Sequence, residues 1–280
     1  MFLPQCPRAP YSVTSVRIRS SYGDIYSANC CADKSTGTKI GVSIWATIEL
    51  FSKPLPAPVY AIKALSLDAL KNVKDGYVLG LGSGRAATVL VKLLSKYIKT
   101  KKISVKCVPT SMQIKLIAEK VGLELIDADQ IDKIDLVFDG ADQIDKNKFL
   151  IKGGGGALLK ENILISAAKK VIIIADNSKF VKDFNRTVPI EIHPLVRQII
   201  WKKIEKFGGK PELRILDRGY PFFTENSNII LDCDFGVIKN PKALQQKLLN
   251  IAGVIEVGIF TRKPDVIYKA KANGKFEILT

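Results

Sequence analysis

The sequence predicts an α/β protein that has a Rossmann-like parallel sheet domain and a smaller inserted α+β domain. Between residues 60 and 187, almost wholly apolar strand-like segments alternate with segments of helical spacing. This alternation is typical of a parallel sheet covered on both faces. From Val188 onward, shorter strands and helices follow one another in an order that favours an α+β arrangement. A last strand-like segment, residues 265–270, could return to the first sheet.

The first domain is expected to comprise residues 59–187 together with 263–280. Continuous apolar runs predict its strands, and apolar residues at helical spacing predict its helices. In chain order we expect a helix over 61–73, a strand over 76–82 that runs into a glycine-rich turn, a helix over 86–98, a strand over 103–108, a helix over 111–120, a strand over 134–138, a helix over 162–168 and a strand over 171–175.

The second domain is expected to comprise residues 188–262. Its predicted elements are an exposed strand over 188–192, a helix over 195–207 that ends at a Gly-Gly pair, strands over 212–216 and 228–233, a helix over 241–251 and a strand over 253–260.

Residues 1–58 differ in composition from the rest of the chain. They are rich in Ser, Thr, Tyr and Ala, and they end in a segment with three prolines. No basic segment precedes a clean apolar run, which argues against a signal peptide. A transit peptide remains open because Arg8, Arg17 and Arg19 lie among Ser and Thr before the first acidic residue; sequence translated from a misplaced start codon also remains open. We expect this extension to be poorly ordered and to take no part in the chemistry.

Composition and charge limit the number of domains and the kinds of partner that the protein is expected to have. A length of 280 residues, 47% of them hydrophobic, supports one or two globular domains. The formal net charge of +16 is spread along the chain, with one dense basic cluster at residues 99–102. A nucleic-acid partner is not expected, because such a footprint should gather on one face, whereas a positive field would attract a small phosphate. The apolar run over residues 40–51 is shorter than the roughly 20 residues of a membrane helix, so no membrane partner is expected.

Cysteine and histidine usage argues against a metal site. The five cysteines have no paired metal-ligand spacing, and His193 is the single histidine of the chain. Mechanisms that need several histidines are therefore excluded. We expect neither a metal nor a cofactor, and a cytoplasmic location with reduced thiols. Organellar targeting by the N-terminal extension stays open.

The first motif, Gly-Leu-Gly-Ser-Gly-Arg-Ala-Ala over residues 80–87, joins a predicted strand to a predicted helix. Glycines allow close approach to an anion, and the helix N-terminus offers free N–H groups, which favours phosphate binding. A tight strand-to-helix turn with no ligand is the alternative. The motif lacks the Gly-Lys-Ser/Thr ending of a P-loop, and the next strand ends without the acidic residue of a dinucleotide site.

Two further motifs follow. Asp139-Gly140-Ala141-Asp142 comes directly after a buried strand, where parallel sheets bind their ligands. Its carboxylates could bind sugar hydroxyls or a metal, or Asp142 could simply cap a helix.

In the third motif, Lys152 precedes four consecutive glycines, and Glu161 follows in the first turns of a helix. Apolar segments flank the glycines, which favours an ordered loop whose backbone meets a ligand. A solvated helix position is the alternative for Glu161.

In this order the three motifs resemble those of the ribose-5-phosphate isomerase A family, which has Gly-x-Gly-Thr/Ser-Gly, Asp-Gly-Ala-Asp, and Lys-Gly-Gly-Gly followed by a catalytic Glu. The resemblance extends over roughly residues 60–280. Further matching segments are 109–111, 175–179, 208–211, 228–232, 253–254 and 258–260.

The resemblance implies the activity, the partner and the role of each residue. The chain would interconvert D-ribose 5-phosphate and D-ribulose 5-phosphate without a metal, and would form a homodimer or homotetramer. Glu161 would accept and return the proton. Lys152 with Gly153, Gly154 and Gly155 would bind substrate and stabilise the oxyanion. The second motif, Asp139, Gly140, Ala141 and Asp142, would contact the sugar, and its carboxylates would assist ring opening and proton movement. Ser83, Gly84, Arg85 and Ala86 would hold substrate, and Lys179 would add a cation for the phosphate.

The chain departs from the family pattern at the first motif. Many members have Thr-Gly-Ser-Thr where this chain has Ser83-Gly84-Arg85-Ala86, so two hydroxyls are lost and a guanidinium is gained. Arg85 could bind phosphate with two hydrogen bonds or point to solvent. Many members also have Gly at the position of Ser227. Two rival functions are a sugar-phosphate-sensing module without catalysis, which should carry a DNA-reading domain, and a nucleotide-dependent oxidoreductase, which the poor dinucleotide fingerprint disfavours.

Overall fold

A computed structural model describes residues 11–19, 25–33, 39–42, 57–271 and 273–280. The chain divides into two units, residues 1–56 and 57–280. In the first unit, β1 (Tyr11–Arg19), β2 (Ile25–Asp33) and β3 (Lys39–Val42) form an antiparallel sheet in the order β1-β2-β3. Helix α1 begins at Ala57, within the stretch 1–58 that was expected to be poorly ordered. The rest of that stretch, apart from the three strands, lies outside the described residues.

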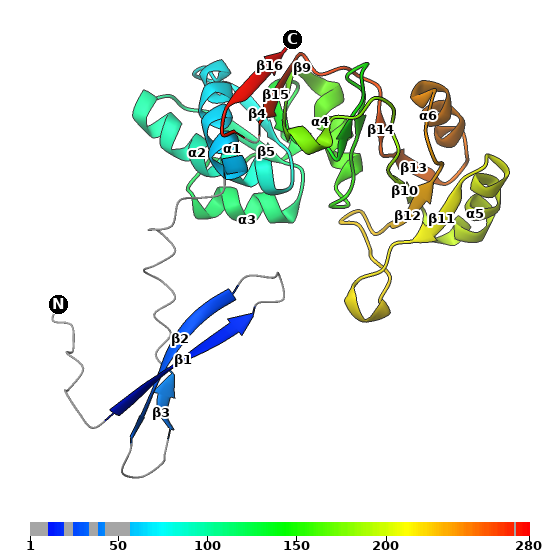
Figure 1. Cartoon of the computed structure of the whole chain (residues 1–280). Helices are drawn as coiled ribbons and strands as arrows, with labels where there is room; N and C mark the ends of the chain where they lie inside the picture. Colours follow the sequence, from blue (N-terminus) through cyan, green and yellow to red (C-terminus); the bar gives the residue numbers. More distant parts are fainter. Residues whose placement is uncertain (1–10, 20–24, 34–38, 43–56, 272) are drawn as a thin grey trace. The chain divides into compact units, whose positions relative to one another are not determined.

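The second unit is built on a six-stranded sheet in the order β16-β15-β9-β6-β4-β5 (Figure 1). Its strands are β4 (Val78–Leu81), β5 (Lys106–Pro109), β6 (Ile134–Asp139), β9 (Ala168–Asp176), β15 (Val266–Ala270) and β16 (Phe276–Leu279). The strands from β15 to β5 are parallel to their neighbours, and β16 is antiparallel to β15. The segment expected to return to the first sheet does so, because β15 pairs with β9. Sequence reasoning missed β16.

Successive side chains along the strands point to opposite faces of the sheet, and each face packs into its own hydrophobic core. Phe138 and Ile172 belong to a cluster with α1 (Ala57–Ala69), α2 (Arg85–Lys101) and α3 (Met112–Lys120). Their neighbours Val137 and Ile173 belong to a cluster with α4 (Leu158–Ala167). Figure 1 shows α1, α2 and α3 on one side of the sheet and α4 on the other. Burial on both faces explains why these strands are continuous apolar runs rather than alternating ones.

The remaining elements form a smaller antiparallel sheet in the order β11-β12-β10-β13. It consists of β10 (Val188–Ile192), β11 (Lys210–Leu213), β12 (Ile229–Asp234) and β13 (Val254–Val257), accompanied by α5 (Arg197–Lys206) and α6 (Pro241–Leu249). A third apolar core fills this part of the chain. Its strands lie in sequence between β9 and β15, so the α/β sheet with a smaller inserted α+β part is the observed fold class.

Two details of the sequence prediction were wrong. Strand β10 is buried at all five positions rather than exposed, because it lies between β12 and β13. The single strand expected over 253–260 is interrupted at Gly258: β13 stays in the small sheet, and β14 (Ile259–Phe260) joins β8 (Leu150–Ile151) and β7 (Gln143–Ile144) in a three-stranded sheet. A Cβ at Gly258 would lie 2.5 Å from the Lys152 carbonyl oxygen, so only glycine allows this crossing.

None of the described helices has both the length and the apolar character needed to cross a membrane. The two cysteines of the second unit that sequence analysis placed in strands, Cys107 and Cys233, are buried free thiols.

Candidate active site

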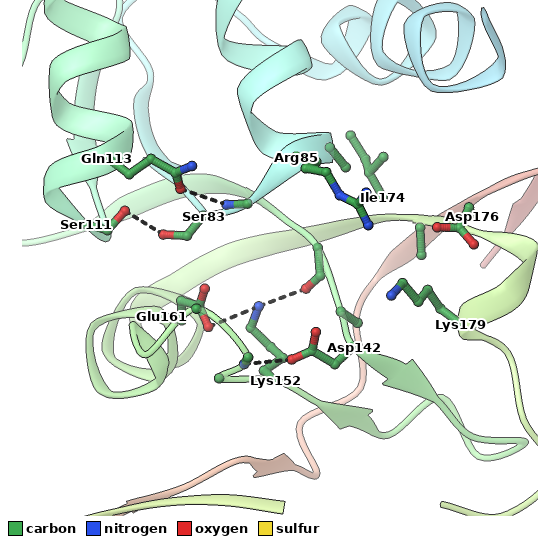
Figure 2. A pocket seen from close by; sticks show the side chains of 18 of the residues that line it. Ser83, Arg85, Ser111, Gln113, Asp142, Lys152, Glu161, Ile174, Asp176 and Lys179 are labelled. Atoms are coloured by element: carbon green, nitrogen blue, oxygen red, sulfur yellow. Dashed lines mark hydrogen bonds and ion pairs between the residues drawn. The ribbon is translucent and has the colours of Figure 1, made fainter. Parts of the chain in front are cut away.

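The three motifs meet in a pocket of about 820 Å³ at the carboxyl ends of β4 and β6. The pocket is lined by Ile62, Ser83, Gly84, Arg85, Ala86, Val89, Ser111, Gln113, Gly140, Ala141, Asp142, Lys152, Gly153, Gly154, Gly155, Glu161, Ile174, Ala175, Asp176, Lys179, Arg186 and Glu225. This is the edge at which parallel α/β sheets bind their ligands. All the sequence-predicted site residues except Asp139 therefore line one pocket (Figure 2).

Lys152 lies at the centre of a buried ionic group. Its Nζ is 2.8 Å from Asp139 Oδ2 and 3.2 Å from Glu161 Oε2, and it donates to the Gly140 carbonyl oxygen at 2.8 Å. The side chains of Lys152, Asp139 and Glu161 are 3%, 0% and 7% exposed. Buried charges persist only where they are paired and hydrogen-bonded, and here one cation serves two carboxylates.

Asp139 lies behind Lys152, and its side chain is withdrawn from the pocket. Its Oδ1 accepts from the Gly140 amide at 2.7 Å. A Cβ at Gly82 would lie 2.0 Å from that same Oδ1, so the first motif needs glycine here to leave room for the carboxylate of the second. Asp139 thus contacts Lys152 and does not line the pocket, whereas Asp142 is the carboxylate of this motif that lines it.

This environment changes the proton affinity of each group. Burial, and then the neighbouring Asp139 charge, raise the pKa of Glu161 to about 7, although Lys152 opposes the rise. Burial likewise raises the pKa of Asp139 against the pull of Lys152. For Lys152, burial would lower the pKa, but Asp139 and Glu161 outweigh it, so its pKa is raised and it stays a cation. A carboxylate whose pKa lies near neutral pH is suited to take up and return a proton.

The glycine loop approaches the pocket in a conformation that requires glycine. Gly153 has φ +97°, and a Cβ at Gly154 would lie 2.9 Å from the Asp142 carboxylate. The Gly154 amide donates to Asp142 Oδ2 at 2.8 Å. Asp142 does not cap a helix: its own amide donates to the Ile151 carbonyl, and β7 follows it. The second and third motifs are therefore joined directly.

The first motif forms the opposite wall. Gly84, with φ +92°, precedes the first residue of α2, so the pocket meets the N-terminus of a 17-residue helix. The Ser83 hydroxyl lies 2.8 Å from the Thr110 hydroxyl and donates to the Ser111 hydroxyl at 2.7 Å. In Figure 2 the side chains of Arg85 and Lys179 lie on the same side of the pocket, away from Glu161. Together with Arg186 they bring the cations among the lining residues to four, Lys152 being the fourth.

Sequence reasoning missed several lining residues, among them Arg186, Gln113 and Glu225. Ser111 and Asp176 lie in segments that matched the family pattern, so that pattern could have indicated them. Arg186 lies in a loop with no motif around it. Glu225 reaches the pocket from the chain between β11 and β12, accepting from the Met112 amide at 2.7 Å and pairing with Lys160 at 2.9 Å.

Within residues 57–271 and 273–280, no group of three or more His, Cys, Asp or Glu side chains is placed to hold a metal ion.

The fold and the buried carboxylate–lysine group are those of an α/β protein whose pocket is suited to acid–base chemistry. Residues 106–274 match the family model described as ribose 5-phosphate isomerase A (phosphoriboisomerase A). The chain belongs to the ribose 5-phosphate isomerase A family, and the resemblance found in the sequence is confirmed.

Individual relatives agree over most of the second unit. The chain is 36% identical over 219 residues to ribose-5-phosphate isomerase A of Methanosarcina acetivorans, a match that covers 78% of this chain and 93% of the relative. A solved D-ribose-5-phosphate isomerase in complex with phospho-erythronic acid is 36% identical with a TM-score of 0.75, covering 78% of this chain and 97% of its own. The Methanocaldococcus jannaschii ribose 5-phosphate isomerase A is 32% identical with a TM-score of 0.74, covering 79% and 98%.

Proposed function

We propose that this protein interconverts D-ribose 5-phosphate and D-ribulose 5-phosphate, an aldose–ketose isomerisation of the non-oxidative pentose phosphate pathway. Membership of the family supports the reaction. The observation that carries the assignment of residues is the buried contact of Lys152 with both Glu161 and Asp139 beside the glycine loop. It unites a base, a fixed cation and backbone amides in one pocket.

In the proposed mechanism, the Glu161 carboxylate removes the proton from C2 of the open-chain aldose. The C–H electron pair forms the C1–C2 double bond, and the C1 carbonyl oxygen becomes an enediolate oxygen. The proton on O2 passes to O1, and Glu161 returns its proton to C1 as C2 becomes the carbonyl carbon. One carboxylate serves both carbon-proton transfers, for which a pKa of about 7 is well suited.

The other groups stabilise charge and hold the sugar. Lys152 and the glycine-loop amides oppose the negative charge on the enediolate oxygens, which is the usual way in which such charge is stabilised. Asp139 orients Lys152 from behind. Asp142, which lines the pocket, assists ring opening of the cyclic sugar.

The phosphate is assigned to the wall opposite Glu161. Arg85 and Lys179 lie there (Figure 2), Arg186 also lines the pocket, and the α2 N-terminus adds free N–H groups and a favourable dipole. Arg85 supplies the guanidinium that this chain has in place of a hydroxyl in many members of the family. The homo-oligomer and the cytoplasmic location stay predictions.

The test is incubation with ribose 5-phosphate in the presence of EDTA and without any cofactor. We expect ketopentose to appear. A sugar-phosphate sensor would bind the compound and leave it unchanged, and an oxidoreductase would turn over only with a nicotinamide cofactor. Either of those results would contradict the proposal.

A further inference from the structure

Arg214 contacts the glycine loop from outside the pocket, although no motif points to it. It follows β11 directly, and its side chain is 14% exposed. The guanidinium meets the Asp232 carboxylate on β12 with two parallel hydrogen bonds: Nε donates to Oδ2 at 2.8 Å, and Nη2 donates to Oδ1. A fork of this kind orients a guanidinium more strictly than a single bond can.

The third nitrogen of Arg214 reaches the glycine loop. Its Nη1 donates to the Gly153 carbonyl oxygen at 2.8 Å and to the Gly154 carbonyl oxygen at 3.3 Å. The Phe222 ring centroid lies 5.7 Å from Cζ. The guanidinium is therefore held by a carboxylate and an aromatic ring while it binds two consecutive carbonyl groups of the loop.

Because of the geometry of the peptide unit, this contact also fixes the direction of the backbone N–H groups in the glycine loop. In a trans peptide unit the carbonyl of one residue and the N–H of the next point in opposite directions. Because the Gly153 carbonyl points to Arg214, the Gly154 N–H points away from it, and that N–H meets Asp142, a pocket-lining residue, at 2.8 Å. By the same rule the Gly154 carbonyl directs the Gly155 N–H away from Arg214.

We propose that Arg214 is a positioning residue for the isomerisation: held by Asp232, it binds the Gly153 and Gly154 carbonyls and thereby aims the Gly155 N–H at the enediolate oxygens. The inference rests on the proposed function. Gly155 lines the pocket, and a Cβ there would have no atom within 4 Å, so there is room beside this residue for a bound sugar. A cationic donor on a carbonyl also polarises the peptide unit, which strengthens the N–H as a donor.

The test compares Arg214→Ala and Arg214→Lys with Arg218→Ala as a matched control, since Arg218 is an exposed arginine four residues further along the same segment. Loss of one oxyanion donor typically lowers kcat by 10²–10³-fold, so misdirecting one should lower kcat by roughly 10- to 100-fold. KM should change by less than about threefold, because an interaction made mainly in the transition state affects kcat. Lys cannot form the fork and should rescue little, whereas added guanidinium should partly restore Arg214→Ala. The control should behave like wild type.

Binding separates positioning from general loosening of the pocket. Phospho-erythronic acid carries a carboxylate at the end remote from its phosphate, so its inhibition constant should rise at least tenfold in Arg214→Ala, in proportion to kcat, while inhibition by inorganic phosphate stays unchanged. Equal weakening of both inhibitors, or kcat within about twofold of wild type in either variant, overturns the inference. Failure of Arg214→Ala to fold, combined with a fully active Arg214→Lys, overturns it as well. A wild-type protein that yields no ketopentose would instead count against the proposed function itself.

Discussion

Lys152 gathers the charged groups of the site around one ammonium nitrogen. With Asp139 behind it and Glu161 beside it, the cation compensates two buried carboxylates that burial alone would leave protonated. Each contact is within hydrogen-bonding distance, and the three side chains come from β6, the end of β8 and the first turns of α4. The pKa of Glu161 is thus a property of this arrangement and not of the residue type.

Replacing Glu161 by Gln should abolish turnover while leaving binding intact. Gln keeps the size of the side chain but removes the base. General acid–base groups contribute roughly 10²–10⁴-fold, and we expect a loss at or beyond the upper end because one group makes both carbon-proton transfers. Steady-state kinetics and a binding measurement with ribose 5-phosphate check this. Turnover within about tenfold of wild type would assign the base to another group; Asp142, which lines the pocket, would come first and Asp139 second.

The pH dependence of kcat/KM should report the raised pKa of Glu161. The base must be ionised, so kcat/KM should fall about tenfold per pH unit below the pKa of about 7. Asp139 raises that pKa, so Asp139→Asn should lower it and shift the acidic limb to lower pH. The two carboxyls titrate as a pair, so the limb reports both. The measurement is a pH series of kcat/KM for both proteins. An acidic limb at the same pH in Asp139→Asn would show that the two groups are not coupled.

At the scale of elements, the site depends on close approaches between segments that only glycine permits. Gly82, at the end of β4, leaves space for the Asp139 carboxylate at the end of β6, and Gly258 lets the chain cross the Lys152 carbonyl between β13 and β14. Neighbouring parallel strands bring these ends together at the edge of the sheet where the pocket lies.

Gly82→Ala should impair catalysis more than the addition of a single methyl group would suggest. The new Cβ would lie 2.0 Å from Asp139 Oδ1, so Asp139 must move and release Lys152. We expect kcat to fall by on the order of tenfold or more, and stability by ~1–3 kcal/mol, the usual cost of overpacking.

The matched control is Gly80→Ala, which lies two residues earlier and inside β4. There the Cβ would lie 2.6 Å from the Val137 Cγ2 methyl, an apolar contact away from the ionic group. Stability should fall comparably while kcat stays within a few fold of wild type. The measurements are thermal unfolding and steady-state kinetics on both variants. An equal loss of kcat in both would mean that the effect comes from strand packing and not from Asp139.

At the scale of the whole molecule, the chemistry belongs to the second unit. The pocket, its ionic group and Arg214 all lie within residues 57–280. The relatives cover 78–79% of the chain and nearly all of their own length. The described strands of the first unit pair with one another in a sheet of their own.

A chain that begins at Ala57, where α1 starts, should therefore keep its isomerase activity. We expect kcat and KM within about twofold of the full chain, since the pocket and its ionic group lie within residues 57–280 and tolerance to truncation concentrates at chain termini. The assay is isomerisation of ribose 5-phosphate by both proteins at equal concentration, with thermal unfolding to show that the shorter chain folds. A shorter chain that folds but is inactive would place an essential role in residues 1–56.

The sequence alone was sufficient for the fold class, the family and the motifs, and it named many of the residues that line the pocket. Continuous apolar strands are typical of a sheet covered on both faces, and glycine-rich turns at strand ends allow the backbone to approach a ligand or another segment closely. The resemblance then indicated Glu161 and Lys152, and local pattern was enough because these residues belong to short contiguous motifs.

Only the tertiary structure decided the features that depend on contacts between distant segments. Burial of β10 depends on strands at both of its edges, and the crossing at Gly258 depends on the Lys152 carbonyl more than 100 residues earlier. The contact of Arg214 with the glycine loop joins residues 60 and 61 positions apart. Such contacts leave no periodicity and no spacing in the sequence, because the chain between them is free to vary while the folded backbone holds their geometry.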